Sequence, residues 1–459
     1  MKIKTINPAT EEILKEYSFL AKSQVMPLVE KAHQRFLQWQ HVPMEKREQC
    51  FLKLIQLLIQ EKHDLAKIIT KTMGKPFTYA LAEIEKCEWI CRHYAQEAKH
   101  YLSGRLIPTE MKITRVCYQP IGVIFAIMPW NFPFWQVFRA AVPTIIAGNT
   151  FLLKHAPNVV EVGCRIEALF LEAGFPPQVL QHIIIDNDVA ADVVAHDRVA
   201  AVTLTGSKKA GSIVASNAAR HLKKAVLELG GNDPYLVLED ADVELAAKAI
   251  VKSRLANCGQ VCIAAKRVLA VASVHDALVE KIQQEMKAYQ MGDPSLDDTR
   301  LGPMARADLR DTLHQQVSKS VGLGAQLLEG GEIPSLKGFY YPPTLLVKVH
   351  PGMPAFEEEL FGPVISVIAV EDEAEAVRLA NQSDYGLGAA IFTRDLKRGE
   401  YLAEVAIQTG SCFVNAVVSS DPRVPFGGIK QSGFGRELSK EGILEFVNTK
   451  TISINNEDL

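Results

Sequence analysis

The chain has 459 residues, of which 48% are hydrophobic and 22% are charged. This composition is that of an ordinary globular protein and excludes a disordered, collagen-like or membrane-embedded class. With 50 basic and 53 acidic side chains, the formal net charge of -3 gives no overall attraction to nucleic acid or to an anionic membrane. We therefore expect small-molecule ligands, and more than one domain, because a single core stops growing at about 250–300 residues.

The N-terminal residues MKIKTINPATEEI have no apolar run behind their lysines, so a secretory signal is not predicted and a cytoplasmic location is expected. The longest strongly apolar stretch, IGVIFAIMPW at 121–130, is shorter than the roughly 20 residues that a membrane span needs, and a buried strand is predicted there. The eight cysteines are scattered along the chain, and disulfides are rare in cytosolic proteins, so no disulfide framework is expected.

In chain order, apolar residues first recur at helical spacing over 23–104, which predicts about three amphipathic helices. Short β-rich runs separated by helical segments follow, and a second such series begins near Pro234. The glycine-rich segment 323–341 is predicted to be a surface loop or hairpin. Strands that alternate with helices predict an α/β fold with doubly wound, mostly parallel sheets.

Two pairs of cysteines share a spacing of four residues, Cys87 with Cys91 and Cys258 with Cys262. A soft-metal site needs about four ligands, and no second pair stands at finger-like spacing, so no metal is predicted. Cys87 and Cys91 lie on a predicted helix and are interpreted as packed thiols. In NCGQVC, by contrast, a glycine and a glutamine follow a predicted helix end, so a thiol there could be an exposed nucleophile.

Two further segments could carry chemistry. In VLELGGND, Glu228 ends a strand-like run in apolar company, which suits a general base, although a solvated glutamate on a turn would have the same pattern. In TLTGSKKAG, a strand leads through Gly206 and Ser207 into a helix whose N-terminus could bind phosphate. No GxGxxG motif is present, so a plain turn with a helix cap is an equal interpretation.

Taken together, seven segments resemble the aldehyde dehydrogenase superfamily in order and spacing, and the resemblance covers almost the whole chain. They are AIMPWNFPFWQ, FLLKHAP, TLTGSKKAG, LELGG, NCGQVC, EEELFGPV and PFGGIKQSGFGRE. The KHAP, LGPMAR and SGFGREL stretches are most similar to bacterial succinate-semialdehyde dehydrogenases.

This resemblance implies that Cys262 attacks the aldehyde carbon as a thiolate. Hydride transfer to the nicotinamide would leave a thioester, and water activated by Glu228 would hydrolyse it to the acid. The side-chain amide of Asn131, with the backbone N–H of Cys262, would stabilise the oxyanion. Cys258 matches no catalytic position, and packing is expected for it.

The resemblance also implies a site for NAD or NADP. Lys154 would bind the adenosine ribose, Gly206 and Ser207 would meet the pyrophosphate, and Glu359 would hold the nicotinamide ribose. Trp130, Leu229, Gly230 and Phe361 would line the nicotinamide path. Relatives that prefer NAD commonly carry a glutamate where this chain has Pro157, so we expect both cofactors to be accepted, with a slight lean to NAD.

The fold implied by the resemblance is aldehyde dehydrogenase-like, with two doubly wound α/β domains and a β oligomerisation arm. The expected boundaries are 1–97 and 121–230 for a Rossmann-like cofactor domain, 231–431 for the catalytic domain, and 98–120 and 437–459 for the arm. The alternating pattern of TKTISIN is also typical of an edge strand that joins a neighbour's sheet. A homodimer or homotetramer is expected.

The expected substrate is an aldehyde with a distant carboxylate, and Arg139 is the residue that suggests it. Arg139 lies in a predicted helical segment that, in the family, lines the tunnel to the nucleophile. A guanidinium in such a tunnel needs an anion as its partner. Arg139 could therefore bind the carboxylate of succinate semialdehyde, with Ser419 or Ser420 as a second donor. The alternative is a buried arginine paired with a structural carboxylate. A second arginine that some relatives carry is replaced here by Ala256.

The candidate site residues disfavour three other functions. A coenzyme-A-acylating dehydrogenase would have less need of Glu228 as a base for water. A cofactor-free esterase would have no use for Glu359 or Lys154. A non-catalytic structural relative would not need Asn131, Glu228 and Cys262 together.

Overall fold

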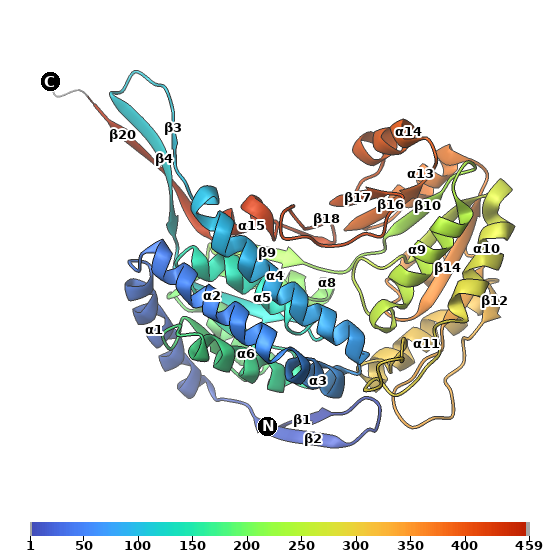
Figure 1. The fold of residues 1–459 in the computed structure, drawn as a ribbon, viewed down its shortest axis with the longest axis horizontal. Coiled ribbons are helices and arrows are strands. Elements are labelled where there is room, and N and C mark those ends of the chain that lie inside the picture. Colours follow the sequence, from blue (N-terminus) through green and yellow to red (C-terminus); the bar gives the residue numbers. More distant parts are fainter. Residues whose placement is uncertain (1, 456–459) are drawn as a thin grey trace.

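Two β-sheets, each covered by helices, form the body of the molecule, and a β-arm projects from one side (Figure 1). The computed structural model describes residues 2–455. None of the helices in this range is both long and apolar enough to cross a membrane.

The first sheet has the strand order β19-β9-β8-β5-β6-β7, and all of its pairs are parallel except the one between β19 and β9. Its strands are β5 (Val123–Met128), β6 (Thr150–His155), β7 (Leu180–His182), β8 (Val199–Thr205), β9 (Lys224–Glu228) and β19 (Gly433–Phe434). The connecting helices are α5 (Trp135–Ile146), α6 (Val160–Glu172), α7 (Asn187–Ala195) and α8 (Lys208–Arg220).

Alternate residues of these strands supply two different cores. On β5, Ile124 and Ala126 pack with α5, α6 and helices of the N-terminal region, whereas Val123 and Phe125 pack with α7, α8 and the first N-terminal helix. Helices therefore cover both faces of the sheet, which explains why its central strands are apolar throughout.

Four helices, rather than about three, fill the N-terminal region. They are α1 (Lys22–Trp39), α2 (Met44–Gln60), α3 (Lys62–Met73) and α4 (Phe77–Tyr101). The segment between α3 and α4 shows why they are separate: Gly74 ends α3 in the left-handed conformation, and Pro76 caps the start of α4. These breaks are short, so helical periodicity alone did not separate the helices.

The second sheet has the order β12-β13-β14-β11-β10-β16-β17. Its strands are β10 (Pro234–Val237), β11 (Arg267–Val271), β12 (Gln326–Glu329), β13 (Thr344–Val347), β14 (Val364–Val370), β16 (Gly388–Phe392) and β17 (Ser411–Val414). Its helices are α9 (Val243–Leu255), α10 (Ala272–Met286), α11 (Ala307–Gly322), α12 (Pro354–Glu357), α13 (Glu373–Asn381) and α14 (Leu396–Tyr401). Only β12 is antiparallel, and it pairs with β13. The segment 323–341, predicted to be a surface loop or hairpin, holds β12 and most of the loop that leads to β13, which lies beyond it.

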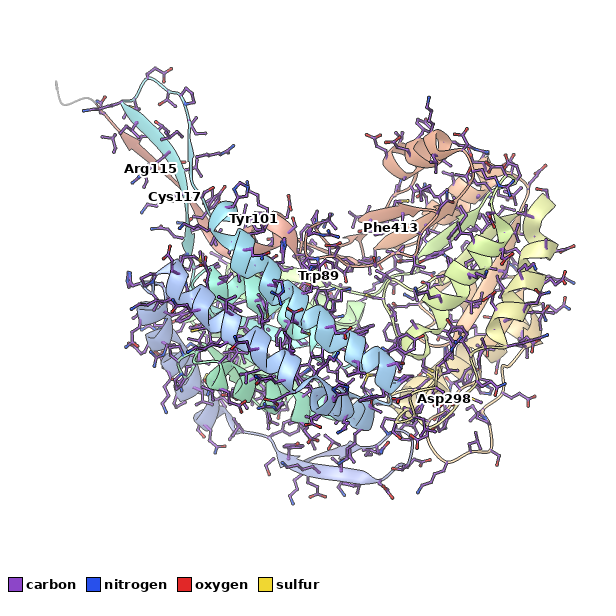
Figure 2. The ribbon with its side chains drawn as sticks, in the orientation of Figure 1. Trp89, Tyr101, Arg115, Cys117, Asp298 and Phe413 are labelled. Carbon is purple, nitrogen blue, oxygen red and sulfur yellow. The ribbon has the colours of Figure 1, made fainter. Side chains whose placement is uncertain are left out.

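The arm is a three-stranded antiparallel sheet that extends away from the body (Figure 1). It consists of β3 (Arg105–Leu106), β4 (Ile113–Pro120) and β20 (Val447–Ile454), and Figure 2 marks β4 by Arg115 and Cys117. The predicted domain boundaries remain a prediction. One strand departs from them, since β19 joins the first sheet from residues that the prediction left unassigned, and 456–459 of the predicted arm lie outside the described residues.

Smaller elements complete the chain. An N-terminal hairpin, β1 (Lys2–Ile6) with β2 (Ile13–Ser18), was not predicted from the sequence. The others are β15 (Tyr385–Gly386), β18 (Ile429–Lys430), α15 (Ser439–Leu444), and the short helices η1 (Pro157–Val159), η2 (Ala256–Gly259) and η3 (Leu402–Ala406).

Candidate functional site

Cys262 lies where two cavities meet. One cavity, of about 240 Å³, is lined by residues that follow β5, β8 and β9 of the first sheet. The other, of about 270 Å³, runs between α4, α5 and the segment 417–420. Cys262 lines both, so two molecules that enter from different sides could meet at its sulfur.

A tight turn between α9 and β11 presents Cys262. Asn257 and Cys258 have positive φ angles of 50° and 54°, and Gly259 has a φ of 70°. A Cβ atom on Gly259 would collide with the carbonyl oxygen of Gly362, so only glycine fits there. The Gln260 side chain closes the turn, because its amide nitrogen donates to the Asn257 carbonyl at 3.1 Å and its oxygen accepts from the Ala305 N–H at 2.9 Å.

The two cysteines of this turn differ in environment. Cys258 is 1% exposed within the core of the second sheet, and burial raises the pKa of its thiol to about 12. Cys262 faces the cavities; its desolvation raises the pKa to about 11, while the charges of Arg139 and Lys266 lower it. Since the thiolate is the nucleophile, reaction at Cys262 should accelerate as the pH rises.

Asn131 lies in the loop after β5 and contacts the turn that carries Cys262. Its side-chain amide donates to the carbonyl oxygen of Gln260 at 3.0 Å, and its own carbonyl accepts from the Asn257 amide at 2.8 Å. An amide nitrogen carries two hydrogens, so one stays available for a substrate oxygen. Glu83 holds the loop by accepting from the N–H groups of Phe134 and Trp135 at 2.8 and 3.1 Å, respectively.

We expect Asn131→Ala to lower the steady-state turnover by about 10²–10³-fold, the usual effect of removing one oxyanion donor. Thermal unfolding of the variant serves as the control for the loop, because Asn131 also fixes the Gln260 carbonyl. A folded variant that turns over at the wild-type rate would remove Asn131 from the mechanism.

Glu228 ends β9 and is 2% exposed, but it lines neither cavity in this conformation. Its Oε1 lies under Gly427, where a Cβ atom would be only 2.8 Å away, and has no hydrogen-bond partner within residues 2–455. Burial raises the pKa of this carboxyl well above its usual range; Arg139 opposes the shift and Glu437 adds to it. To act as a base towards Cys262, the side chain has to rotate into the cavity.

The cavity beside the first sheet collects most of the residues expected to bind a dinucleotide. Those that line it, besides Asn131 and Cys262, are Trp130, Gly206, Ser207, Leu229, Gly230, Glu359 and Phe361. They follow the carboxyl ends of three adjacent strands or come from the facing 359–361 segment, and the carboxyl edge of an open parallel sheet is where such ligands bind.

Local chemistry in this cavity fits a phosphorylated, hydroxylated ligand. Ser207 caps α8 by accepting from the Ala210 N–H at 3.3 Å, so the helix N-terminus opens at the cavity. Glu359 is fixed by the Gly231 N–H and by the ammonium of Lys266, both at 3.0 Å, and keeps a second carboxylate oxygen for hydroxyl groups. A Cβ atom on Gly230 would collide with Glu359.

Lys154 and Pro157 do not line this cavity. Lys154 is buried near the end of β6, where desolvation lowers the pKa of its ammonium and the charge of Asp186 raises it. Pro157 begins η1 directly after that strand. Their expected contact with the adenosine ribose therefore remains a prediction.

Arg139, Ser419 and Ser420 line the other cavity together with Cys262. The Arg139 guanidinium is 2% exposed, forms an ion pair with Glu437 and lies 4.6 Å from the centre of the Phe426 ring. Backbone hydrogen bonds of 2.7 Å join Glu437 to Phe426 in both directions and hold the carboxylate in place. Glu437 is thus the structural carboxylate that the alternative interpretation of Arg139 required. The Nη2 atom of Arg139 nevertheless has no hydrogen-bond partner in the described chain.

Lys86 was missed in the sequence analysis. It lines the same cavity and donates from Nζ to the Ser420 hydroxyl at 2.8 Å. The signal that could have found it is its spacing on α4, three residues after buried Glu83 and four before buried Ile90.

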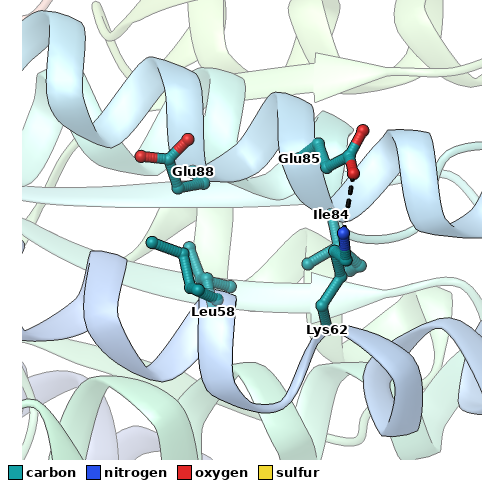
Figure 3. A pocket seen from close by; sticks show the side chains of 6 residues that line it. Leu58, Lys62, Ile84, Glu85 and Glu88 are labelled. Carbon is teal, nitrogen blue, oxygen red and sulfur yellow. Dashed lines mark hydrogen bonds and ion pairs between the residues drawn. The ribbon is translucent and has the colours of Figure 1, made fainter.

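A further hollow lies on the outer surface between α2, α3 and α4 (Figure 3). Leu58 and Ile84 form its floor, and Lys62 pairs with Glu85 across it at 2.8 Å. None of its lining residues borders either cavity at Cys262.

Comparison with known proteins assigns the family. Residues 1–452 match the description "Aldehyde dehydrogenase family". The chain belongs to the aldehyde dehydrogenase family. The resemblance in the sequence motifs and the predicted fold class are therefore confirmed.

Individual members of the family match over nearly their full length. The chain is 44% identical to a probable succinate-semialdehyde dehydrogenase [NADP(+)] of Synechocystis sp., covering 99% of this chain and 100% of the relative. It is also 44% identical to a succinate semialdehyde dehydrogenase [NAD(P)+] of Escherichia coli, covering 98% and 97%. A crystal structure of succinic semialdehyde dehydrogenase from Streptococcus pyogenes with NADP+ has a TM-score of 0.97 at 36% identity, covering 99% and 100%.

Proposed function

We propose that the protein oxidises succinate semialdehyde to succinate with NADP or NAD as the hydride acceptor. The observation that carries the proposal is the position of Cys262, which borders one cavity at the carboxyl edge of a parallel sheet and a second cavity with cations in its wall. Relatives that are 41–44% identical to this chain are named for this substrate.

In the proposed mechanism, the Cys262 thiolate adds to the aldehyde carbon, and the amide of Asn131 and the Cys262 N–H stabilise the resulting oxyanion. A nicotinamide held by the residues that line the cavity beside the first sheet would supply the acceptor for the hydride of the same carbon. Glu228, once rotated towards the thioester, removes a proton from the attacking water, and succinate leaves as the thiolate re-forms.

The test is the rate of reduced cofactor formation from succinate semialdehyde, measured with and without coenzyme A, with the product identified by chromatography. We expect free succinate in both cases. Dependence on coenzyme A with a thioester product would establish the acylating alternative. Ester hydrolysis without aldehyde oxidation would establish an esterase, and absence of both reactions would indicate a structural relative.

Cofactor choice is tested at Pro157, where a carboxylate would repel a 2′-phosphate. Several relatives are named for NADP(+) and one for NAD(P)+, so we propose that both cofactors are accepted with a preference for NADP, in place of the slight lean to NAD expected from the sequence. We expect Pro157→Glu to raise the KM for NADP by about tenfold or more through like-charge repulsion, with a smaller effect on NAD. Steady-state kinetics with both cofactors measure this, with Pro157→Gln as the uncharged control. An unchanged KM for NADP would place residue 157 away from the ribose.

Substrate choice is tested at Arg139, which we propose contributes with Ser419 and Ser420 to binding the substrate carboxylate. Arg139→Leu should cost about 0.5–1.5 kcal/mol in kcat/KM for succinate semialdehyde beyond any loss for butanal, the contribution of an ordinary hydrogen bond, because Glu437 already neutralises the guanidinium. The variant should also unfold more readily, because buried Glu437 loses its partner. Equal losses for the two aldehydes would assign Arg139 to the fold alone.

We also propose that the protein acts in the cytoplasm as a homodimer or homotetramer. The arm supports this assembly, because β20 pairs with β4 over its full length, has mostly exposed side chains and extends with β4 beyond the body. A strand at the edge of such a sheet offers unpaired backbone groups to a second copy.

A further inference from the structure

Four charged side chains line the cavity between α4, α5 and 417–420, and they differ in whether the protein already neutralises them. Glu83 forms a buried ion pair with Lys75, and Arg139 pairs with Glu437. Lys252 is exposed to solvent on α9. Lys86 is half-buried and has no carboxylate within 4.0 Å among residues 2–455, so its charge is the one in this wall that is neither paired nor well solvated.

The neighbours of Lys86 favour an anion in the cavity. Its Nζ lies 4.5 Å from the centre of the Trp135 ring, and its one hydrogen bond within the described residues goes to the Ser420 hydroxyl at 2.8 Å. An ammonium group has three hydrogens, so others stay available for a ligand. A cation in such apolar company is stabilised when an anion joins it.

We propose that Lys86 is the principal cation that binds the substrate's carboxylate, with the Ser420 hydroxyl positioning its ammonium. This inference rests on the proposed oxidation of succinate semialdehyde and deepens it. A carboxylate bound at Lys86 and an aldehyde at Cys262 would occupy the same cavity, since both side chains line it. Arg139, which is already paired with Glu437, then contributes less than Lys86 to binding the substrate's carboxylate.

The experiment compares kcat/KM for succinate semialdehyde and for butanal, which has the same chain length without the carboxylate. In the wild type we expect succinate semialdehyde to be preferred. Lys86→Met keeps the length of the side chain and should lower kcat/KM for succinate semialdehyde by about 10- to 100-fold, leaving butanal nearly unchanged. Lys86→Arg should restore most of the preference. Lys62→Met, on the outer surface, is the matched control and should change neither value.

A pH series gives an independent readout. The charged and titratable groups that face Lys86 are Glu83 and Cys87 on α4, Arg139 on α5, and Asp421; burial and Arg139 lower its pKa to about 8, while the others raise it. The ammonium is therefore lost as the pH rises through about 8, and the preference for succinate semialdehyde should fall there. Ionisation of Cys262 cancels in the ratio of the two substrates. In Lys86→Arg the ratio should stay constant over this range.

The possible results distinguish the proposed substrate from the role of Lys86. A wild type without preference for succinate semialdehyde would overturn both the proposed substrate and the role of Lys86. A wild-type preference that Lys86→Met keeps would overturn the role of Lys86 alone. A preference lost in Lys252→Met but kept in Lys86→Met would also overturn the role of Lys86 and would assign carboxylate binding to Lys252.

Discussion

We expect Cys262→Ala to lower aldehyde oxidation by at least about 10⁴-fold, because an enzyme that has lost its nucleophile has no covalent route to the acid. The loss should be in kcat. Cofactor affinity, measured by titration of the protein's fluorescence, should stay close to that of the wild type, because the cavity beside the first sheet keeps its other lining residues.

Cys258→Ala is the matched control, since the two thiols lie on the same turn. The sulfur of Cys258 is buried in the core of the second sheet, and Cys258 borders neither cavity. Turnover of the Cys258→Ala variant should therefore stay within a few-fold of the wild type. If Cys258→Ala were inactive and Cys262→Ala active, the two cysteines would have been assigned the wrong way round.

We expect the second large effect from Glu228→Gln, which should slow release of the acid by about 10²–10⁴-fold, the usual contribution of a positioned general base. The amide keeps the size of the side chain but cannot take a proton from water. Hydride transfer precedes this step, so rapid mixing should show a burst of about one reduced cofactor per site, followed by slow turnover.

The pH dependence provides a further check on Glu228. Its carboxyl must be ionised to act as a base, and burial raises its pKa, so acid release in the wild type should speed up as the pH rises above the usual range of a carboxyl. Glu167→Gln is the matched control, because burial also raises the pKa of that carboxyl, on α6 outside both cavities. Undiminished steady-state turnover in Glu228→Gln would exclude it as the base.

Local pattern was sufficient to predict much of the fold. Strand and helix alternation predicted the two parallel sheets, because buried parallel strands are apolar throughout and short. β19 was not predicted, since a two-residue strand has no periodicity and its place beside β9 depends on contacts across some two hundred positions of chain.

Part of the candidate site could likewise be predicted from the sequence, and part could not. The Gly-Gln pair before Cys262 indicated a special turn, and the structure gives a physical reason, since Gly259 lies against the Gly362 carbonyl and Gln260 closes the turn. The pairing of Arg139 with Glu437 could not be predicted, because their distance in space depends on how α5 and the C-terminal segment pack. The spacing of Lys86 on α4 could have placed it on the buried face of that helix, but its contact with Ser420 could not be predicted, because Ser420 lies far along the chain.

If Cys262 is the nucleophile, the substrate becomes covalently bound at its sulfur. The most direct measurement is peptide mass spectrometry of Glu228→Gln, quenched in acid after mixing with NADP and succinate semialdehyde. The prediction is a succinyl group on the peptide that contains both Cys258 and Cys262, located by fragmentation on Cys262. A succinyl group on Cys258, or one equivalent of reduced cofactor formed with no acyl group on the protein, would contradict it.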